Sequence, residues 1–244
     1  MSNLTIILLL CGLIVLSYLF GNISNAVILS KFKKQDIRTM GSGNPGTLNM
    51  SRNFGFKFGL LTLFLDLLKG MLPTLIGFLV FRKTYFEGTE FLVADIAKYA
   101  LGLSVVLGHI YPVFYKFKGG KGIASTIGVF LACEPLLALL AIVFVFLFIF
   151  FFEYGSLGSL IGVTFLAVAS VVTLYNKYES ILSFVSKYLL IANLLLVAIC
   201  FFTWFAHRKN ILSLLSADEH KTSIKAMIKR AKEKKANKIK TEQK

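Results

Sequence analysis

The stretch IASTIGVFLACEPLLALLAIVFVFLFIFFF, residues 123–152, decides how this chain is arranged. It is a nearly continuous apolar run of 30 residues, whereas about 20 residues suffice for a helix to cross a bilayer. Glu134-Pro135 lies within the run, and proline removes a backbone donor and clashes with the preceding turn. We therefore expect a short helix over 123–133 and a second helix over 136–152. At about 1.5 Å per residue the short helix cannot cross the hydrocarbon core, so it must be embedded partly against protein or thinner bilayer.

The composition is that of an integral membrane protein. Of the 244 residues, 56% are hydrophobic, and the mean hydropathy is +0.74. The first apolar segment, 3–20, has no basic residue ahead of it and no small-residue cleavage site after it, so we expect a retained helix and not a signal peptide. The predicted fold class is all-α: a polytopic membrane helix bundle.

Basic residues in the short loops orient this bundle, because cytoplasmic loops are enriched in Lys and Arg. The loop after the first segment carries Lys31, Lys33, Lys34, Arg38, Arg52 and Lys57. By the same rule, Lys121 and the basic C-terminal tail also belong on the cytoplasmic side. The chain between them must therefore cross the membrane an even number of times, and dividing the long run at Pro135 gives an even number. We expect about seven transmembrane helices, some short or half-spanning, with the N-terminus outside and the C-terminus cytoplasmic. They are 3–20, 58–81, 91–110, 123–133, 136–152, 157–175 and 181–206.

The C-terminal end is strongly basic. From His207 to Lys244 there are 12 Lys or Arg against 4 Asp or Glu, a net charge of +8. Because this tail follows an apolar helix directly, anionic lipid headgroups are expected partners, in preference to nucleic acid. We expect a transmembrane domain over 1–212 and a cytoplasmic tail over 213–244 that is partly helical or disordered.

Two polar, glycine-rich and basic strings interrupt the apolar sequence. The first is GSGNPG, residues 41–46, running on to Arg52; the second begins at Gly108-His109 and ends in GGKG, residues 119–122. Glycines present consecutive backbone N–H groups, and Lys and Arg add charge, so such strings suit phosphate, above all at a helix N-terminus. The expected topology places both strings on one face with the 156–159 and 207–210 segments. The GGKG string is not a Walker A motif. A turn at the membrane surface that is anchored by its lysine would contain the same residues, so this alternative stays open.

Four strings together resemble a known family. They are DIR (36–38) with GSGNPG, Asn49 and Arg52; LDLLKG (65–70) with Leu72-Pro73; GHIYP (108–112) with FKGGKG (117–122); and HRKNI (207–211). In this order they are similar to the bacterial acyl-phosphate-dependent glycerol-3-phosphate acyltransferase family, from about residue 5 to 221. Thr47-Leu48, Ser213 and Ala217 depart from the family pattern.

The resemblance implies a reaction and a location. The sn-1 hydroxyl of glycerol 3-phosphate attacks the carbonyl of a long-chain acyl phosphate, giving lysophosphatidic acid and phosphate. The acyl phosphate is a mixed anhydride with a good leaving group, so the enzyme chiefly orients two anions and stabilises developing charge. A bacterial inner (plasma) membrane protein with its active site facing the cytoplasm is implied.

The resemblance also implies site residues. Phosphate binding is implied for Ser42, Arg52 and Lys121, backbone donation to the acyl phosphate for the glycines of GGKG, and glycerol-phosphate contacts for His207 and Asn210. A serine of the 156–159 segment is implied as well, and Ser159 is favoured. We expect catalytic roles for Ser42, Arg52, Lys121 and Asn210, and substrate-binding roles for Gly43, Asn44, His109, Gly119, Gly120, Gly122, Ser156, Ser159 and His207.

Several alternatives stay open from the sequence. His109 can accept the hydroxyl proton, or a substrate phosphate can take it while His109 orients or supports the site. Asp66 and Lys69 are expected to pair or to face the bundle interior. No metal is expected, because no cluster of His, Asp or Glu residues has the spacing of metal ligands. No cofactor is expected either. A transporter or channel for a phosphorylated solute is the alternative function, although inverted repeats are not apparent.

Overall fold

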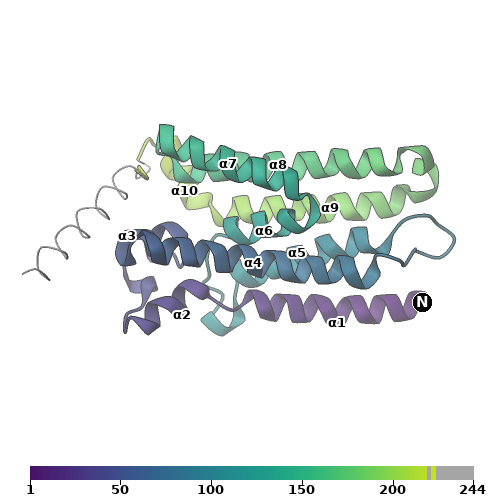
Figure 1. The fold of residues 1–244 in the computed structure, drawn as a ribbon, viewed down its shortest axis with the longest axis horizontal. Coiled ribbons are helices and arrows are strands. Elements are labelled where there is room, and N and C mark those ends of the chain that lie inside the picture. Colours follow the sequence, from purple (N-terminus) through teal and green to yellow (C-terminus); the bar gives the residue numbers. More distant parts are fainter. Residues whose placement is uncertain (219–220, 224–244) are drawn as a thin grey trace, which may run out of the picture.

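The structure is a computed structural model that describes residues 1–218 and 221–223 (Figure 1). Most of the predicted C-terminal tail therefore lies outside the described residues. The described part confirms the all-α class, with one isolated bridge between Tyr85 and Leu92. Its helices are α1 (Asn3–Gly21), α2 (Asn25–Phe32), α3 (Thr47–Phe54), α4 (Phe56–Phe81), α5 (Val93–Ile110), α6 (Ile123–Cys133), α7 (Pro135–Phe152), α8 (Gly155–Tyr178), α9 (Leu182–Ala206) and α10 (Arg208–Leu215).

The long apolar run is divided between α6 and α7 as predicted. Pro135 is the first residue of α7, where its missing N–H leaves no helical hydrogen bond unmade. Within the described residues, six helices are long and apolar enough to cross a membrane, and α6 is a shorter apolar helix. The number of crossings and the sides of the two termini stay predictions.

The loop between the first two apolar segments differs from the expectation. Instead of an irregular connection it contains the short helices α2 and α3 and a 3-10 turn, Ile37–Thr39. In Figure 1, α2, α3 and α10 lie together at one end of the bundle, and the N-terminus lies at the other. The glycine-rich strings belong to the end with the short helices.

The short helix α6 is embedded by close contact with α4. A Cβ atom at Gly128 would overlap the carbonyl oxygen of Leu67, and one at Gly70 would overlap that of Ser125. The two backbones can approach this closely only because both positions are glycine, the usual device for packing helices in membranes. The half-length helix is thus supported by protein, as its length requires.

A buried network of ion pairs and hydrogen bonds joins α5 to α8 at the opposite end of the bundle. Asp95, near the start of α5, is 2% exposed and accepts hydrogen bonds from Lys177 and from the Tyr178 hydroxyl of α8, each at 2.5 Å. The Lys98 ammonium lies 2.9 Å from the same carboxylate. A carboxylate this deep is stable only when paired, so the network joins α5 to the end of α8.

Candidate active site

A cavity of about 510 Å³ opens at the end of the bundle where α2, α3 and α10 lie. It has a polar part and an apolar part. Ten of the thirteen site residues predicted from the sequence line it: Ser42, Asn44, Arg52, His109, Lys121, Gly122, Ser156, Ser159, His207 and Asn210. Gly43, Gly119 and Gly120 do not line it.

The first glycine-rich string is shaped by Asn49 of α3. The Asn49 amide oxygen accepts a hydrogen bond from the Ser42 backbone N–H at 3.2 Å, and its amide nitrogen donates to the carbonyls of Met40 and Ile37. Asn49 is 2% exposed, so these bonds are shielded from water. No role for Asn49 could be predicted beyond its place in the string, yet its side chain sets the conformation of the loop around Ser42.

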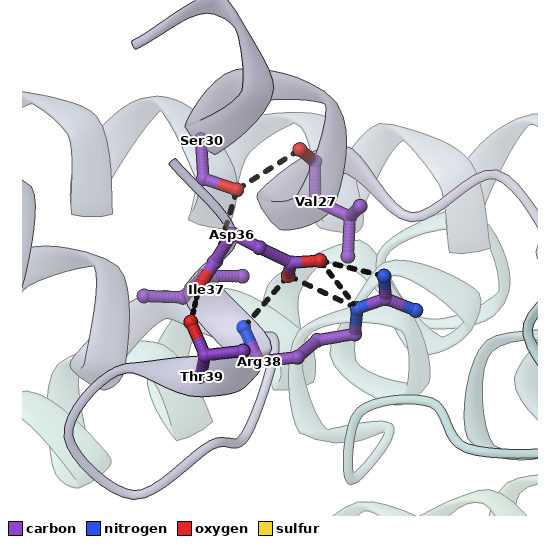
Figure 2. Close-up of polar contacts among 6 residues, drawn as sticks. All are labelled: Val27, Ser30, Asp36, Ile37, Arg38 and Thr39. Atoms are coloured by element: carbon purple, nitrogen blue, oxygen red, sulfur yellow. Dashed lines mark hydrogen bonds and ion pairs between the residues drawn. The ribbon is translucent and has the colours of Figure 1, made fainter. Parts of the chain in front are cut away.

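Hydrogen bonds and an ion pair also hold the segment that precedes this string (Figure 2). The Asp36 carboxylate accepts from the Arg38 backbone N–H at 2.9 Å and pairs with the Arg38 guanidinium at 2.6 Å. The side-chain hydrogen bond from Arg38 lowers the pKa of Asp36 to about 2. The Ser30 hydroxyl donates to the Val27 carbonyl and accepts from the Ile37 N–H, which fixes the turn to α2. Arg38 is therefore engaged with its own loop, and it is not among the residues that line the cavity.

The second string places Lys121 in the cavity, but the backbone N–H groups of the first two glycines of GGKG bond to other parts of the chain. Lys121 donates from its ammonium to the Asn210 amide oxygen, so two predicted residues from distant segments meet. The N–H groups of Gly119 and Gly120 donate to the carbonyls of Ile110 and His109, both at 3.1 Å. The prediction that these two glycines donate to the acyl phosphate is therefore not supported. They are needed for close packing instead, because a Cβ atom at Gly120 would overlap the His109 ring.

His109 lies between the cavity and a buried pair of charges. Its Nδ1 atom lies 3.9 Å from an Asp66 carboxylate oxygen, which also accepts a hydrogen bond from Asn25 at 2.8 Å. The Lys69 ammonium lies 3.4 Å from Asp66 and donates to the Ile23 carbonyl at 2.8 Å. Asp66 and Lys69 are paired as expected, and Asp66 also lines the cavity. The imidazole ring of His109 is therefore buried beside the Asp66–Lys69 pair.

The two serines of α8 are not equivalent. The Ser159 hydroxyl donates to the Gly155 carbonyl of its own helix at 2.7 Å. The Ser156 hydroxyl is buried and has no hydrogen-bond partner among the described residues. A buried hydroxyl without a partner is costly, which favours a role in holding a ligand. The geometry therefore favours Ser156 over Ser159 as the serine that contacts a substrate.

His207, which ends α9, is held in one tautomer. Its Nδ1 atom lies 2.8 Å from the Thr203 carbonyl oxygen, and since a carbonyl can only accept, Nδ1 carries the proton. Burial lowers the pKa of His207 to about 4, against the opposing effect of that hydrogen bond and with a further lowering by the Lys121 charge. In the neutral ring Nε2 is an acceptor. The glycerol-phosphate contact expected for His207 from the resemblance can thus be made by an acceptor, which suits a substrate hydroxyl.

Two cavity residues had no signal in the sequence. Asp218 and Thr222 follow α10 and line the cavity, and Thr222 accepts a hydrogen bond from Arg52 at 2.8 Å. Residues this close to a basic, polar tail give no pattern that separates them from their neighbours. Within the described part of the chain, no group of three His, Cys, Asp or Glu side chains is arranged to hold a metal ion.

The apolar part of the cavity runs between three helices. It is lined by Phe56, Leu60, Leu63 and Leu67 of α4, Ile123 and Ile127 of α6, and Ile142, Val145, Phe146 and Ile149 of α7. Leu60 and Phe146 are 52% and 50% exposed although both line the cavity, so this part is open to the surroundings of the bundle. A hydrocarbon chain fits such a surface.

The fold and this cavity together define a class of protein. It is a helical bundle of membrane type with a cavity that pairs a cationic, hydrogen-bonding end with an apolar slot, as a site for an anionic head and a lipid tail requires.

Comparison with known proteins gives the family. The family profile described as glycerol-3-phosphate acyltransferase matches residues 11–217, and the chain belongs to this family. The glycerol-3-phosphate acyltransferase of Thermoanaerobacter pseudethanolicus is 37% identical over 217 residues, covering 88% of this chain and 96% of the relative. The Aquifex aeolicus enzyme of the same name is 35% identical, covering 86% and 97%.

A solved structure is also similar. The crystal structure of PlsY (YgiH), an integral membrane glycerol 3-phosphate acyltransferase in its glycerol 3-phosphate form, matches with a TM-score of 0.73 and 32% identity. The match covers 90% of this chain and 98% of that one. A second PlsY structure, in a lysophosphatidic acid form, matches with a TM-score of 0.71. The similarity confirms the helical membrane fold expected from the sequence.

Proposed function

We propose that this protein transfers a long-chain acyl group from an acyl phosphate to the sn-1 hydroxyl of glycerol 3-phosphate, giving lysophosphatidic acid and inorganic phosphate. The observation that carries the proposal is the two-part cavity, with Arg52 and Lys121 at its polar end and an apolar slot between α4, α6 and α7. Family membership and the similarity to PlsY support the same reaction.

The cavity residues suit the requirements of this reaction. Both substrates carry phosphate, and two cations from different segments can hold two anions near one another. Ser42 and Ser156 add hydroxyl donors, and the apolar slot takes the acyl chain. Bringing the hydroxyl and the activated carbonyl together in a fixed geometry supplies much of the rate enhancement when the leaving group is already good.

The proton of the attacking hydroxyl needs an acceptor. In the proposed step the glycerol oxygen forms a bond to the acyl carbonyl carbon, the bond from that carbon to the phosphate oxygen breaks, and the proton ends on the departing phosphate. Neutral His207, with Nε2 as acceptor, can orient the hydroxyl. His109, whose Nδ1 atom lies 3.9 Å from Asp66, is placed to support the site from the side of α5.

We further propose a setting for the reaction. The loop basicity supports a bacterial inner (plasma) membrane protein whose cavity faces the cytoplasm. The transmembrane domain over 1–212 supplies most of the cavity, Asp218 and Thr222 of the following segment add to it, and the basic tail contacts anionic membrane lipids. Neither a cofactor nor nucleic acid enters this scheme.

The test is acyl transfer by purified full-length protein in detergent. Phosphate should be released from palmitoyl phosphate only when glycerol 3-phosphate is present, with lysophosphatidic acid formed in equal amount. Lys121→Ala should abolish turnover, since it removes a cation and leaves Asn210 without its partner. The matched control is Lys118→Ala, because Lys118 belongs to the same loop but is exposed and does not line the cavity. Glycerol 3-phosphate flux into proteoliposomes without acyl transfer would instead favour a transporter.

A further inference from the structure

Thr222 joins the cavity from beyond the part of the chain that the family profile matches, which ends at residue 217. Its side chain is 3% exposed and lines the cavity. Its hydroxyl oxygen accepts a hydrogen bond from an Arg52 guanidinium nitrogen at 2.8 Å, across 170 positions of sequence. Neither the glycine-rich strings nor the family match assigns a role to this residue.

Thr222 is itself fixed to the turn between α7 and α8. Its backbone N–H donates to the Glu153 carbonyl at 2.7 Å, and Glu153 ends α7 with a left-handed φ of 63°. The start of α8 also approaches closely, because a Cβ atom at Gly155 would lie 3.3 Å from the Thr222 hydroxyl oxygen. The hydroxyl is therefore presented to Arg52 from a residue that is bonded to the turn between α7 and α8.

Arg52 needs such a support. It belongs to α3, which has only eight residues, and its side chain is exposed. A long, exposed arginine loses much rotamer freedom when it binds an anion, and holding it in place beforehand removes part of that cost. A neutral hydroxyl does this without cancelling the charge, whereas a carboxylate would neutralise it, as Asp36 does for Arg38.

We propose that Thr222 is a positioning residue that holds the Arg52 guanidinium for a substrate phosphate, so that a residue beyond α10 completes the site. The inference rests on the phosphate-binding role proposed above for Arg52. It assigns no chemical step to Thr222, which acts only through the arginine.

Steady-state kinetics of the full-length protein with palmitoyl phosphate and glycerol 3-phosphate test this. Thr222→Val removes the hydroxyl at nearly constant volume. It should raise KM for at least one phosphate substrate by about 5- to 10-fold, the effect of one lost hydrogen bond, while kcat changes less than about twofold. Thr222→Ser should restore KM, and in an Arg52→Gln background Thr222→Val should have no further effect on KM.

The matched control is Thr173→Val, the same substitution at an exposed threonine of α8 whose hydroxyl donates to the Ala169 carbonyl of its own helix. If Thr222→Val does not fold, Thr222→Ala carries the test with the same expected result. Unchanged or lowered KM values, or a full effect of Thr222→Val in the Arg52→Gln background, would overturn the proposal. Absence of turnover by the wild-type protein would overturn the proposed function and this inference together, whereas an active wild type with an unaffected variant overturns the inference alone.

Discussion

Ser156 and Ser159 lie one turn apart on α8, yet only Ser159 has a hydrogen-bond partner among the described residues. Their spacing in the sequence is compatible with either serine facing the site. What distinguishes them is the Gly155 carbonyl, which accepts the Ser159 hydroxyl and leaves that of Ser156 available. Such a local choice between backbone and ligand cannot be predicted from residue types alone.

We expect Ser156→Ala to lower kcat/KM by about 5- to 10-fold, because a hydroxyl that contacts the substrate is lost. The thermal stability of the variant should be unchanged or slightly raised, since a buried hydroxyl without a partner is removed. Ser159→Ala is the matched control and should change kcat/KM less than about twofold. Kinetics and thermal unfolding in detergent measure both effects, and a larger kinetic effect at Ser159 would contradict the assignment.

His207 predicts a pH dependence of stability. Its pKa is lowered to about 4 from an ordinary value of 6.5, so on unfolding the ring takes up a proton between these pH values. The stability contributed by the neutral ring is complete above pH 6.5 and is lost as the pH falls toward 4.

The melting temperature of the wild type should therefore fall by about 5 °C more than that of His207→Asn between pH 7 and 4.5, from the size of the pKa shift. Asparagine keeps a donor for the Thr203 carbonyl but does not titrate. His109 is common to both proteins and cancels in the difference. Parallel pH profiles for the two proteins would show that His207 is not held neutral by the fold.

At the scale of elements, the long helices and α6 could be predicted from the sequence, whereas α2 and α3 could not. The division at Pro135 follows from length and from the chemistry of proline, and α6 and α7 lie where it places them. The helices α2 and α3 have eight residues each, and α3 has no apolar run, while the run of four apolar residues in α2 is too short to predict a separate helix. They exist because tertiary contacts support them, such as the bonds of Asn49 to the preceding loop.

The contact between α4 and α6 gives a test at this scale. Gly128→Ala places a methyl group against the Leu67 carbonyl, so we expect destabilisation by about 1–3 kcal/mol and a lower melting temperature. Gly12→Ala is the control: no atom lies within 4 Å of its added Cβ, and alanine favours the helix. Equal melting temperatures for the two variants would mean that α6 does not depend on this close approach.

At the scale of the whole molecule, two groups of charged side chains in the described part of the chain have different roles. The Asp95 network joins α5 to α8 at one end, and the cations of the cavity stand at the other. The sequence predicts that the cavity cations lie together, because the basic loops and the number of membrane crossings place the glycine-rich strings on one side of the membrane. It does not predict the joining of Arg52 to Thr222, since that contact depends on how the chain returns after α10.

The exposed wall of the apolar slot, formed by Leu60 and Phe146, has a consequence for how the enzyme meets its substrates. A donor with a long acyl chain approaches sideways from the lipid layer, while the glycerol phosphate arrives from water. The acyl donor therefore reaches the site by two-dimensional diffusion in the membrane, and the glycerol phosphate reaches it by three-dimensional diffusion in water. For the proposed donor, the quantity that saturates the enzyme is its mole fraction among the surrounding lipids, and added detergent lowers the rate by surface dilution at constant bulk concentration.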